Sequence, residues 1–118
     1  MLKKKLNMSE YELYLNVILE MIEKIENSIK NLSKEQFLKK EESMDATLMR
    51  LQVIGENVKS IPLKIKKTQK EFKWRKFEKL RNFISHKYSQ IDEDIIWEII
   101  QKDLIKLKSV IENIKNEN

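Results

Sequence analysis

The sequence contains no cysteine and only one glycine, one proline and one histidine among its 118 residues. Without cysteine there is neither a disulfide framework nor a thiolate metal site, and nothing argues for an oxidising compartment. With one histidine, a zinc site within one chain would have to rest on carboxylates, so we expect no metal and no cofactor. Because residues that break helices are so scarce, we expect an all-α fold.

Long hydrophobic runs are also missing. No segment approaches the roughly 20 apolar residues of a membrane span, and the basic start at residues 1–7 is not followed by the apolar stretch of a signal peptide. We therefore expect a cytoplasmic protein without a membrane partner. A chain of 118 residues suits one hydrophobic core, so residues 1–118 are expected to form a single domain.

The first third of the chain shows two capping signals. Ser9 and Glu12 have the spacing of a capping box, and the apolar residues after them recur at steps of three and four as far as Leu32. This pattern predicts a long amphipathic helix that starts at Ser9. Ser33 and Gln36 repeat the capping signal and predict a short connecting element.

A second helical pattern covers residues 44–61, and Pro62 ends it. Gly55 lies inside this pattern, where it costs about 1 kcal/mol relative to alanine. We therefore expect the backbone of a neighbouring element to approach closely there. Residues 63–70 are expected to form a basic connection to the next helical pattern.

Two further helical patterns cover residues 72–86 and 91–114, and the acidic residues 92–94 suit the start of the last helix. Together the patterns predict an antiparallel bundle of four to five helices. Ile96, Ile99 and Val110 lie beside the last apolar stripe, which is then wider than one partner helix needs. A homodimer interface would cover them; alternatively, they complete the core of the monomer.

Positive charge is concentrated in the second half of the chain. The net charge is +5, and residues 59–81 contain ten basic residues against two acidic ones. Such a stretch can bind nucleic acid, and we assign an RNA-binding basic patch to Lys73, Arg75, Lys76 and Lys79. The alternative is a solvated, lysine-rich loop and helix face.

Arg81, His86 and Tyr88 form the one cluster with the residue types of an active site. On an ideal helix Arg81 and Tyr88 lie about 20° apart, whereas His86 lies about 140° from Arg81. A site that uses all three needs the helix to end near His86, or needs groups from a second subunit. Asn82 and Ser85 are candidate supporting residues.

These residue types suit the cleavage of RNA without a metal. His86 can act as acid or base near neutral pH, and the permanently charged Arg81 can stabilise a phosphorane. With one histidine per chain, an acid–base pair of imidazoles can form only across a two-fold axis. Singly, Arg81 could instead form a surface salt bridge with Glu78, His86 could be structural, and Tyr88 could simply pack its ring.

The order of Arg81, four residues, His86, one residue and Tyr88 resembles the signature of the HepT-type toxins, a branch of the HEPN superfamily. Residues 51–56 resemble the Leu-x-x-Ile-Gly-Glu helix of that family. Trp74 and Trp97 stand before and after the motif as they do in such toxins. Lys87 occupies the variable position of the motif, where an additional cation should favour a polyanion.

The resemblance extends from about Tyr11 to Ile114 and implies a homodimeric bundle that cleaves RNA, either mRNA or tRNA. In that family the motif arginine and histidine are catalytic, which assigns these roles to Arg81 and His86. The partner implied is a minimal nucleotidyltransferase antitoxin that transfers AMP to the motif tyrosine, here Tyr88. The alternative is a non-catalytic module that binds nucleotide or RNA and docks such a partner.

Overall fold

A computed structural model describes the backbone of residues 2–117 and the side chains of residues 10–117. All regular structure in that part of the chain is helical, which confirms the expected all-α fold. The elements in chain order are α1 (Leu2–Ile29), α2 (Lys34–Lys39), α3 (Glu41–Ser60), α4 (Leu63–Lys66), the 3-10 turn η1 (Lys67–Gln69), α5 (Arg75–Lys87), the 3-10 turn η2 (Tyr88–Gln90), α6 (Glu93–Glu98), the π-helical turn η3 (Ile99–Asp103) and α7 (Leu104–Asn116).

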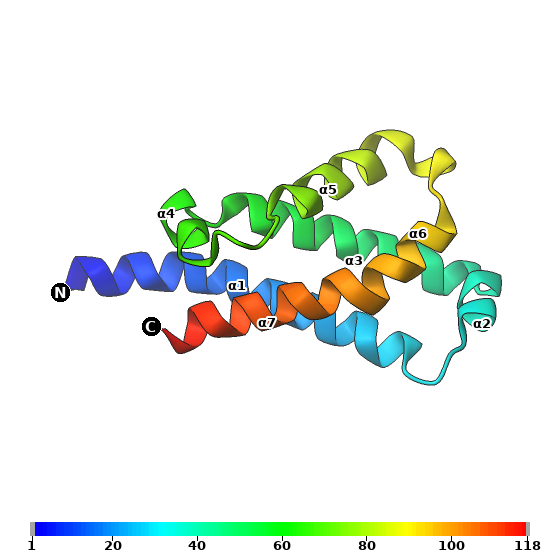
Figure 1. The fold of residues 1–118 in the computed structure, drawn as a ribbon, viewed down its shortest axis with the longest axis horizontal. Helices are drawn as coiled ribbons and strands as arrows, with labels where there is room; N and C mark the ends of the chain where they lie inside the picture. Colours follow the sequence, from blue (N-terminus) through cyan, green and yellow to red (C-terminus); the bar gives the residue numbers. More distant parts are fainter. Residues whose placement is uncertain (1, 118) are drawn as a thin grey trace.

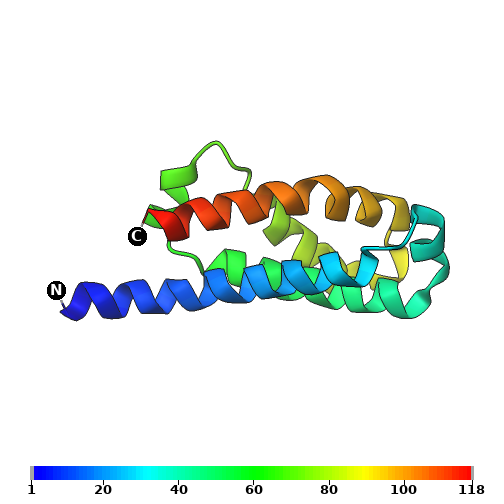
Figure 2. The ribbon, with the colours of Figure 1, turned by 90° about the horizontal axis from the view of Figure 1, so that it is seen from below.

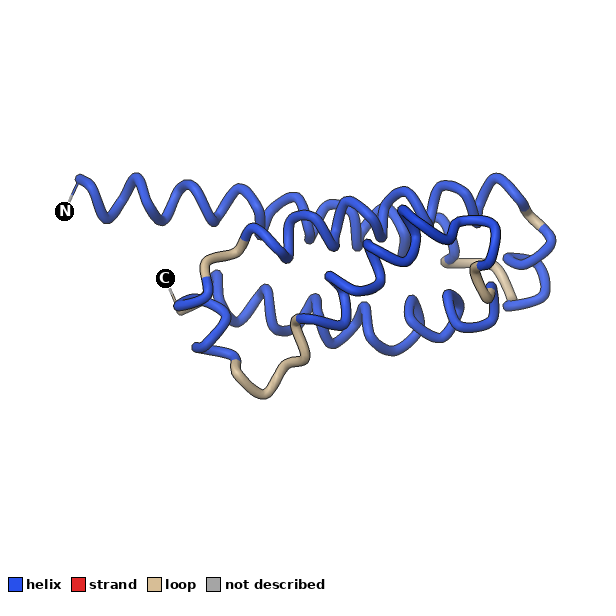
Figure 3. Tube along the Cα trace, turned by 90° about the horizontal axis from the view of Figure 1, so that it is seen from above, coloured by secondary structure: helices blue, strands red, loops and turns tan. Residues whose placement is uncertain are grey.

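Four long helical segments run in alternating directions along a molecule of 51 × 29 × 23 Å (Figure 1). They are α1, α3, α5 and the continuous run from α6 to α7, as the expected bundle requires. α3 packs against both α1 and α5, and α7 packs against α1. Figure 2 shows α1 and α7 running lengthwise, and Figure 3 shows the loops gathered at the two ends of the bundle.

α1 begins at Leu2 and not at the capping box of Ser9 and Glu12, so that predicted helix start is wrong. Residues 2–8 contain neither proline nor glycine, so nothing ends the helix before Ser9. The second capping box is confirmed. The Ser33 hydroxyl accepts a hydrogen bond from the Gln36 N–H at 3.1 Å, and the Gln36 side chain accepts one from the Ser33 N–H at 2.9 Å.

α3 ends at Ser60, directly before Ile61 and Pro62, as predicted. The basic connection that follows contains the short helix α4 and the 3-10 turn η1. Proline is well tolerated at the beginning of a helix, and Pro62 is the N-cap residue of α4.

The last helical run begins as predicted, since the Asp92 carboxylate accepts hydrogen bonds from the backbone N–H groups of Asp94 and Ile95. It is interrupted by the π-helical turn η3, which the sequence pattern did not reveal. Within the described residues, no helix combines the length and apolar composition needed to cross a membrane.

The wide apolar face of the last helix is used inside the monomer. Ile96 and Ile99 are buried, and Val110 is partly buried against the same core. α2 packs against α6, with the ring centroids of Phe37 and Trp97 5.3 Å apart. These three residues therefore complete the monomer core, and they are not the dimer surface that we first expected.

Candidate active site

α3 and α5 cross at Gly55, and this crossing fixes the backbone position of Arg81. A Cβ atom on Gly55 would lie 2.7 Å from the carbonyl oxygen of Phe77 and would overlap the Cβ of Arg81. Only glycine fits such a contact without a shift of the helices. The expected close approach is confirmed, and the approaching helix is the one that carries the candidate catalytic residues.

The Arg81 guanidinium is held from two sides. Its Nη2 lies 3.3 Å from Oε1 of Glu56 on α3, and its Nη1 donates a hydrogen bond to the Asn82 side chain at 3.1 Å. Its Nε is buried and has no hydrogen-bond partner in the part of the chain that the structure describes. Glu78, the salt-bridge partner considered from the sequence, contacts Lys66 instead. Two anchors hold the charge, while the side chain stays 33% exposed and open to an anion.

Two more polar contacts join α3 to the chain around α5. Gln52 donates a hydrogen bond to the Ser85 hydroxyl at 2.8 Å, and the Tyr88 hydroxyl donates one to the Asp45 carboxylate. With the Glu56 contact they form a line along the helix pair, which we call the polar seam. Its members are Asp45, Gln52, Glu56, Arg81, Ser85 and Tyr88.

Tyr88 has an exposed ring, but its hydroxyl group is held by a hydrogen bond. The residue is 53% exposed, and its hydrogen bond to Asp45 is the main cause that raises the pKa of its phenol above 10.0. Desolvation and the negative charges of Asp45 and Glu41 act in the same direction. Tyr88 is therefore a neutral phenol whose proton already points at a carboxylate.

His86 lies on the outward face of α5, exposed and without a hydrogen-bond partner among the described residues. α5 ends one residue later at Lys87, which is also exposed. The polar seam thus brings Arg81, Ser85 and Tyr88 to one side of the helix, and His86 stays about 140° away from Arg81. One chain alone does not assemble all three motif residues around a single point.

The predicted basic patch lines a cavity of about 750 Å³ at the other end of α5. Lys73, Arg75 and Lys79 are exposed, whereas Lys76 forms an ion pair of 2.9 Å with Asp103. Three of the four predicted patch residues therefore have no ion-pair partner among the described side chains and can bind an anion, whereas Lys76 is already paired with the Asp103 carboxylate.

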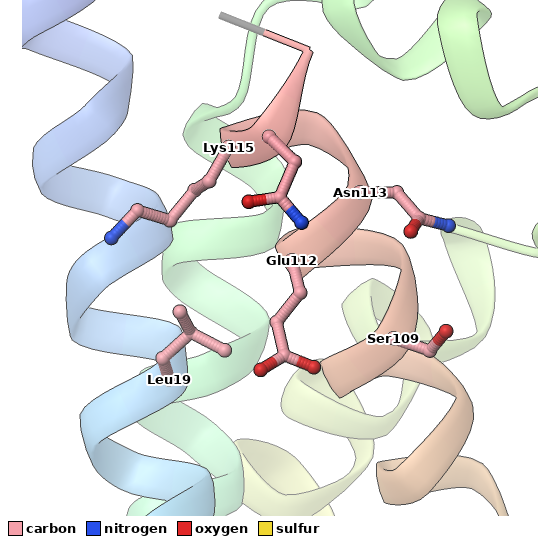
Figure 4. Close-up of a pocket in the computed structure, with 6 residues that line it drawn as sticks. Leu19, Ser109, Glu112, Asn113 and Lys115 are labelled. Atoms are coloured by element: carbon pink, nitrogen blue, oxygen red, sulfur yellow. The ribbon is translucent and has the colours of Figure 1, made fainter.

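A second hollow, of about 440 Å³, lies between α1 and α7 (Figure 4). Figure 4 shows Leu19 from α1 and Glu112 from α7 beside this space. Its lining lacks the positive charge of the first cavity, with one lysine, Lys115, beside one carboxylate. Among the described residues, no group of three histidine or acidic side chains could hold a metal ion.

The family model described as "Ribonuclease HepT-like" matches residues 18–114, which include every member of the polar seam. The chain belongs to the HepT-like ribonuclease family. The resemblance seen in the motif is thereby confirmed.

Two relatives illustrate the range of HepT-like proteins. The chain is 31% identical over 102 residues to the "Probable ribonuclease HepT" of Thermococcus cleftensis, covering 86% of this chain and 93% of that protein. It is 33% identical over 108 residues to the "Gamma-glutamylcyclotransferase and putative RNase" of Methanocaldococcus jannaschii. That match covers 92% of this chain and 49% of the larger relative. No solved structure matches the chain.

Three polar seam residues of this HepT-like chain were not identified as site residues from the sequence. They are Asp45, Gln52 and Glu56, which lie seven and four residues apart and so share one face of α3. The sequence shows this spacing, but it does not show that this face of α3 packs against α5. The nearest signal was the Gly-Glu pair at residues 55 and 56, where the glycine marks the crossing and the glutamate follows it.

Proposed function

We infer that this HepT-like chain cleaves RNA without a metal ion and that Arg81 and His86 are its catalytic residues. The observation that supports this most strongly is the contrast between the two side chains. Arg81 is held in place by Glu56 and Asn82, whereas His86, five residues further along α5, is exposed and has no hydrogen-bond partner among the described side chains. Family membership supports the same assignment.

In the proposed reaction, the 2′-oxygen of a ribose attacks the adjacent phosphorus atom. One imidazole removes the 2′-hydroxyl proton, and an acid protonates the departing 5′-oxygen as the P–O5′ bond breaks. The Arg81 guanidinium stabilises the negative charge of the phosphorane between these events. The products are a 2′,3′-cyclic phosphate and a 5′-hydroxyl end.

The proposal includes a homodimer, since a base and an acid are both needed and the chain has one histidine. A two-fold axis near the end of α5 would bring two copies of His86 into one cleft. The outward position of His86 suits this arrangement, because a second copy can reach it there. Ser85 and Asn82 then act as supports, and Lys87 adds positive charge at the rim.

We place the protein in a toxin–antitoxin pair as the toxin, with Tyr88 as the residue that a nucleotidyltransferase modifies. The Tyr88 oxygen would attack the α-phosphorus of ATP, the bond to the β-phosphate would break, and pyrophosphate would leave. The Asp45 carboxylate, which already accepts the hydrogen bond from Tyr88, is placed to take the phenolic proton. The resulting anionic adduct beside the cleft would repel RNA.

A non-catalytic role is the second candidate, favoured by the cavity lined with lysines at the far end of α5. In that case the chain would bind nucleotide or RNA and dock the nucleotidyltransferase without turnover. Loss of His86 would then leave any effect on cells unchanged.

The test is cleavage of total RNA and of tRNA by the purified protein in EDTA, wild type against His86→Ala. We expect the wild type to cut and the variant to leave RNA intact, with unchanged folding. Prior incubation with the cognate nucleotidyltransferase and Mg-ATP should stop cleavage by the wild type but not by Tyr88→Phe. Binding of RNA without cleavage by the wild type would instead support the non-catalytic module.

The dimer is tested separately by sedimentation and by a mixed dimer of wild-type and His86→Ala chains carrying different tags. If the acid and the base come from two copies, the mixed dimer is as inactive as the variant. Half of the wild-type activity would show that each copy of His86 works alone.

A further inference from the structure

The cavity beside the start of α5 differs from the hollow between α1 and α7 in both charge and lining. Its volume is about 750 Å³, and the described residues of its wall include seven basic side chains and one carboxylate. The carboxylate, Glu78, lies 3.5 Å from the nearly buried ammonium group of Lys66. Five basic residues of the wall have no ion-pair partner among the described side chains: Lys67, Lys70, Lys73, Arg75 and Lys79.

The cavity is not only a charged surface. Leu63, Phe72 and Trp74 supply apolar area, and the rings of Phe72 and Trp74 meet edge to face at 4.9 Å. The Trp74 indole N–H donates a hydrogen bond to the Lys66 carbonyl at 3.2 Å, which fixes the aromatic wall to α4. Unpaired cations beside fixed aromatic rings suit a ligand that carries both phosphates and bases.

The cavity and His86 share one face of α5. Arg75, Lys79, Asn82 and His86 follow one another at steps of four, three and four, so they lie within about 60° around the helix. All four are exposed. Arg75 and His86 are eleven residues apart on the helix, which corresponds to about 16 Å. A single strand of several nucleotides can span this distance, whereas one nucleotide is too short.

We propose that this cavity is an anchoring site for single-stranded RNA, which holds the strand several nucleotides away from the bond at His86. Phosphates contact the unpaired cations, and a base packs against Leu63 and Phe72. The strand then follows the outward face of α5 to the motif. This proposal rests on the proposed function for the position of the cut, but the binding itself does not require cleavage.

The test measures the binding of labelled single-stranded RNA to His86→Ala protein, which leaves the probe intact. The probes are oligomers of about 12 and about 4 nucleotides, within the range of known single-strand sites. The variant is Lys70→Gln with Lys73→Gln, and the matched control is Lys30→Gln with Lys106→Gln. Both control lysines are exposed: Lys30 lies just beyond the end of α1, and Lys106 lies on α7.

We expect the cavity variant to bind the long probe on the order of ten-fold more weakly, and its salt dependence to fall by about 1.4 in slope for two lost phosphate contacts. The control should leave both quantities unchanged, and the short probe should discriminate less between the variants. Equal binding of the long probe by variant and control would overturn the proposal. So would equally strong competition by ATP alone or by an oligoglutamate peptide.

The two proposals fail in different ways. If the wild type does not cut RNA but the cavity variant still loses affinity, the anchoring site stands and the nuclease is rejected. If the wild type cuts RNA and the cavity variant binds and cuts like the control, the anchoring site is rejected alone.

Discussion

The two helix pairs at the centre of the molecule are built for different purposes. Between α1 and α7 the facing residues are apolar and fully buried, as Ile18, Ile22, Leu107 and Ile111 illustrate. Among the described residues, the polar contacts of this pair lie at its rim, where Lys108 pairs with Glu26 and Lys115 donates a hydrogen bond to Asn16. Between α3 and α5 the outer edge is instead the polar seam. Polar pairs that are partly exposed contribute little to stability, so we connect the polar seam, which lies beside the motif, with the proposed function and not with folding.

The largest effect on activity is expected at Arg81. Arg81→Lys keeps the charge but loses the planar group that reaches Glu56 and Asn82 together. We expect RNA cleavage to fall at least about 100-fold, as for the loss of a group that stabilises the transition state, with little change in thermal stability. Parallel measurement of kcat/KM and of the melting curve checks this. A variant that retains wild-type cleavage would remove Arg81 from the mechanism.

The largest effect on stability is expected in the other helix pair. Ile111→Ala removes a fully buried side chain of α7 and should lower the free energy of unfolding by about 2–5 kcal/mol. The fraction that remains folded should cleave RNA at the normal rate. Denaturant unfolding together with a cleavage assay tests the separation, and a specific loss of activity in the folded fraction would contradict it.

Gly55→Ala is expected to lower both RNA cleavage and the free energy of unfolding, because the crossing of α3 and α5 determines where Arg81 lies. The added methyl group must displace the Phe77 carbonyl and the Arg81 side chain, at a cost of about 1–3 kcal/mol. We expect reduced cleavage even in the folded protein. Ala46→Gly, elsewhere on α3 and away from this contact, lowers stability by about 1 kcal/mol through helix propensity and is the control for a general loss of stability. Equal activity of the two variants would argue against a positioning role.

The smallest effect is expected at Asp45. Asp45→Asn removes the charge that helps to raise the pKa of Tyr88, so that pKa should fall toward its ordinary value of about 10. Since the folded pKa is raised, the bond stabilises the protein below pH 10 and this contribution is lost as the pH rises through the higher folded pKa. Phenolate absorbance, corrected with Tyr88→Phe, measures the shift, and Asp94→Asn should leave it unchanged.

Local signals in the sequence predicted local structure well. The Ser33 and Gln36 box, the end of α3 before Pro62 and the Asp92 cap each depend on neighbouring residues only. The Ser9 box failed because a capping signal cannot start a helix where the preceding residues already favour one. The π turn at residues 99–103 left no recognisable pattern.

Features that depend on tertiary packing were predicted less well from the sequence. Ile96 and Ile99 looked like a second interface, because the contribution of α2 to covering α6 could not be counted from the sequence. Arg81, His86 and Tyr88 were found from their spacing, whereas the roles of Glu56 and Asp45 required knowledge that α3 lies beside α5. Gly55 was the exception. Because glycine destabilises a helix, its presence there predicted the close approach of a neighbouring helix, which is α5.

The most direct test of the account is an analysis of the RNA ends produced in EDTA by the wild type and by His86→Ala. We predict fragments with 2′,3′-cyclic phosphate and 5′-hydroxyl ends from the wild type and no fragments from an equally stable variant. Intact RNA with the wild type, or the same fragments from His86→Ala, would contradict the assignment of this face of α5 as a ribonuclease centre.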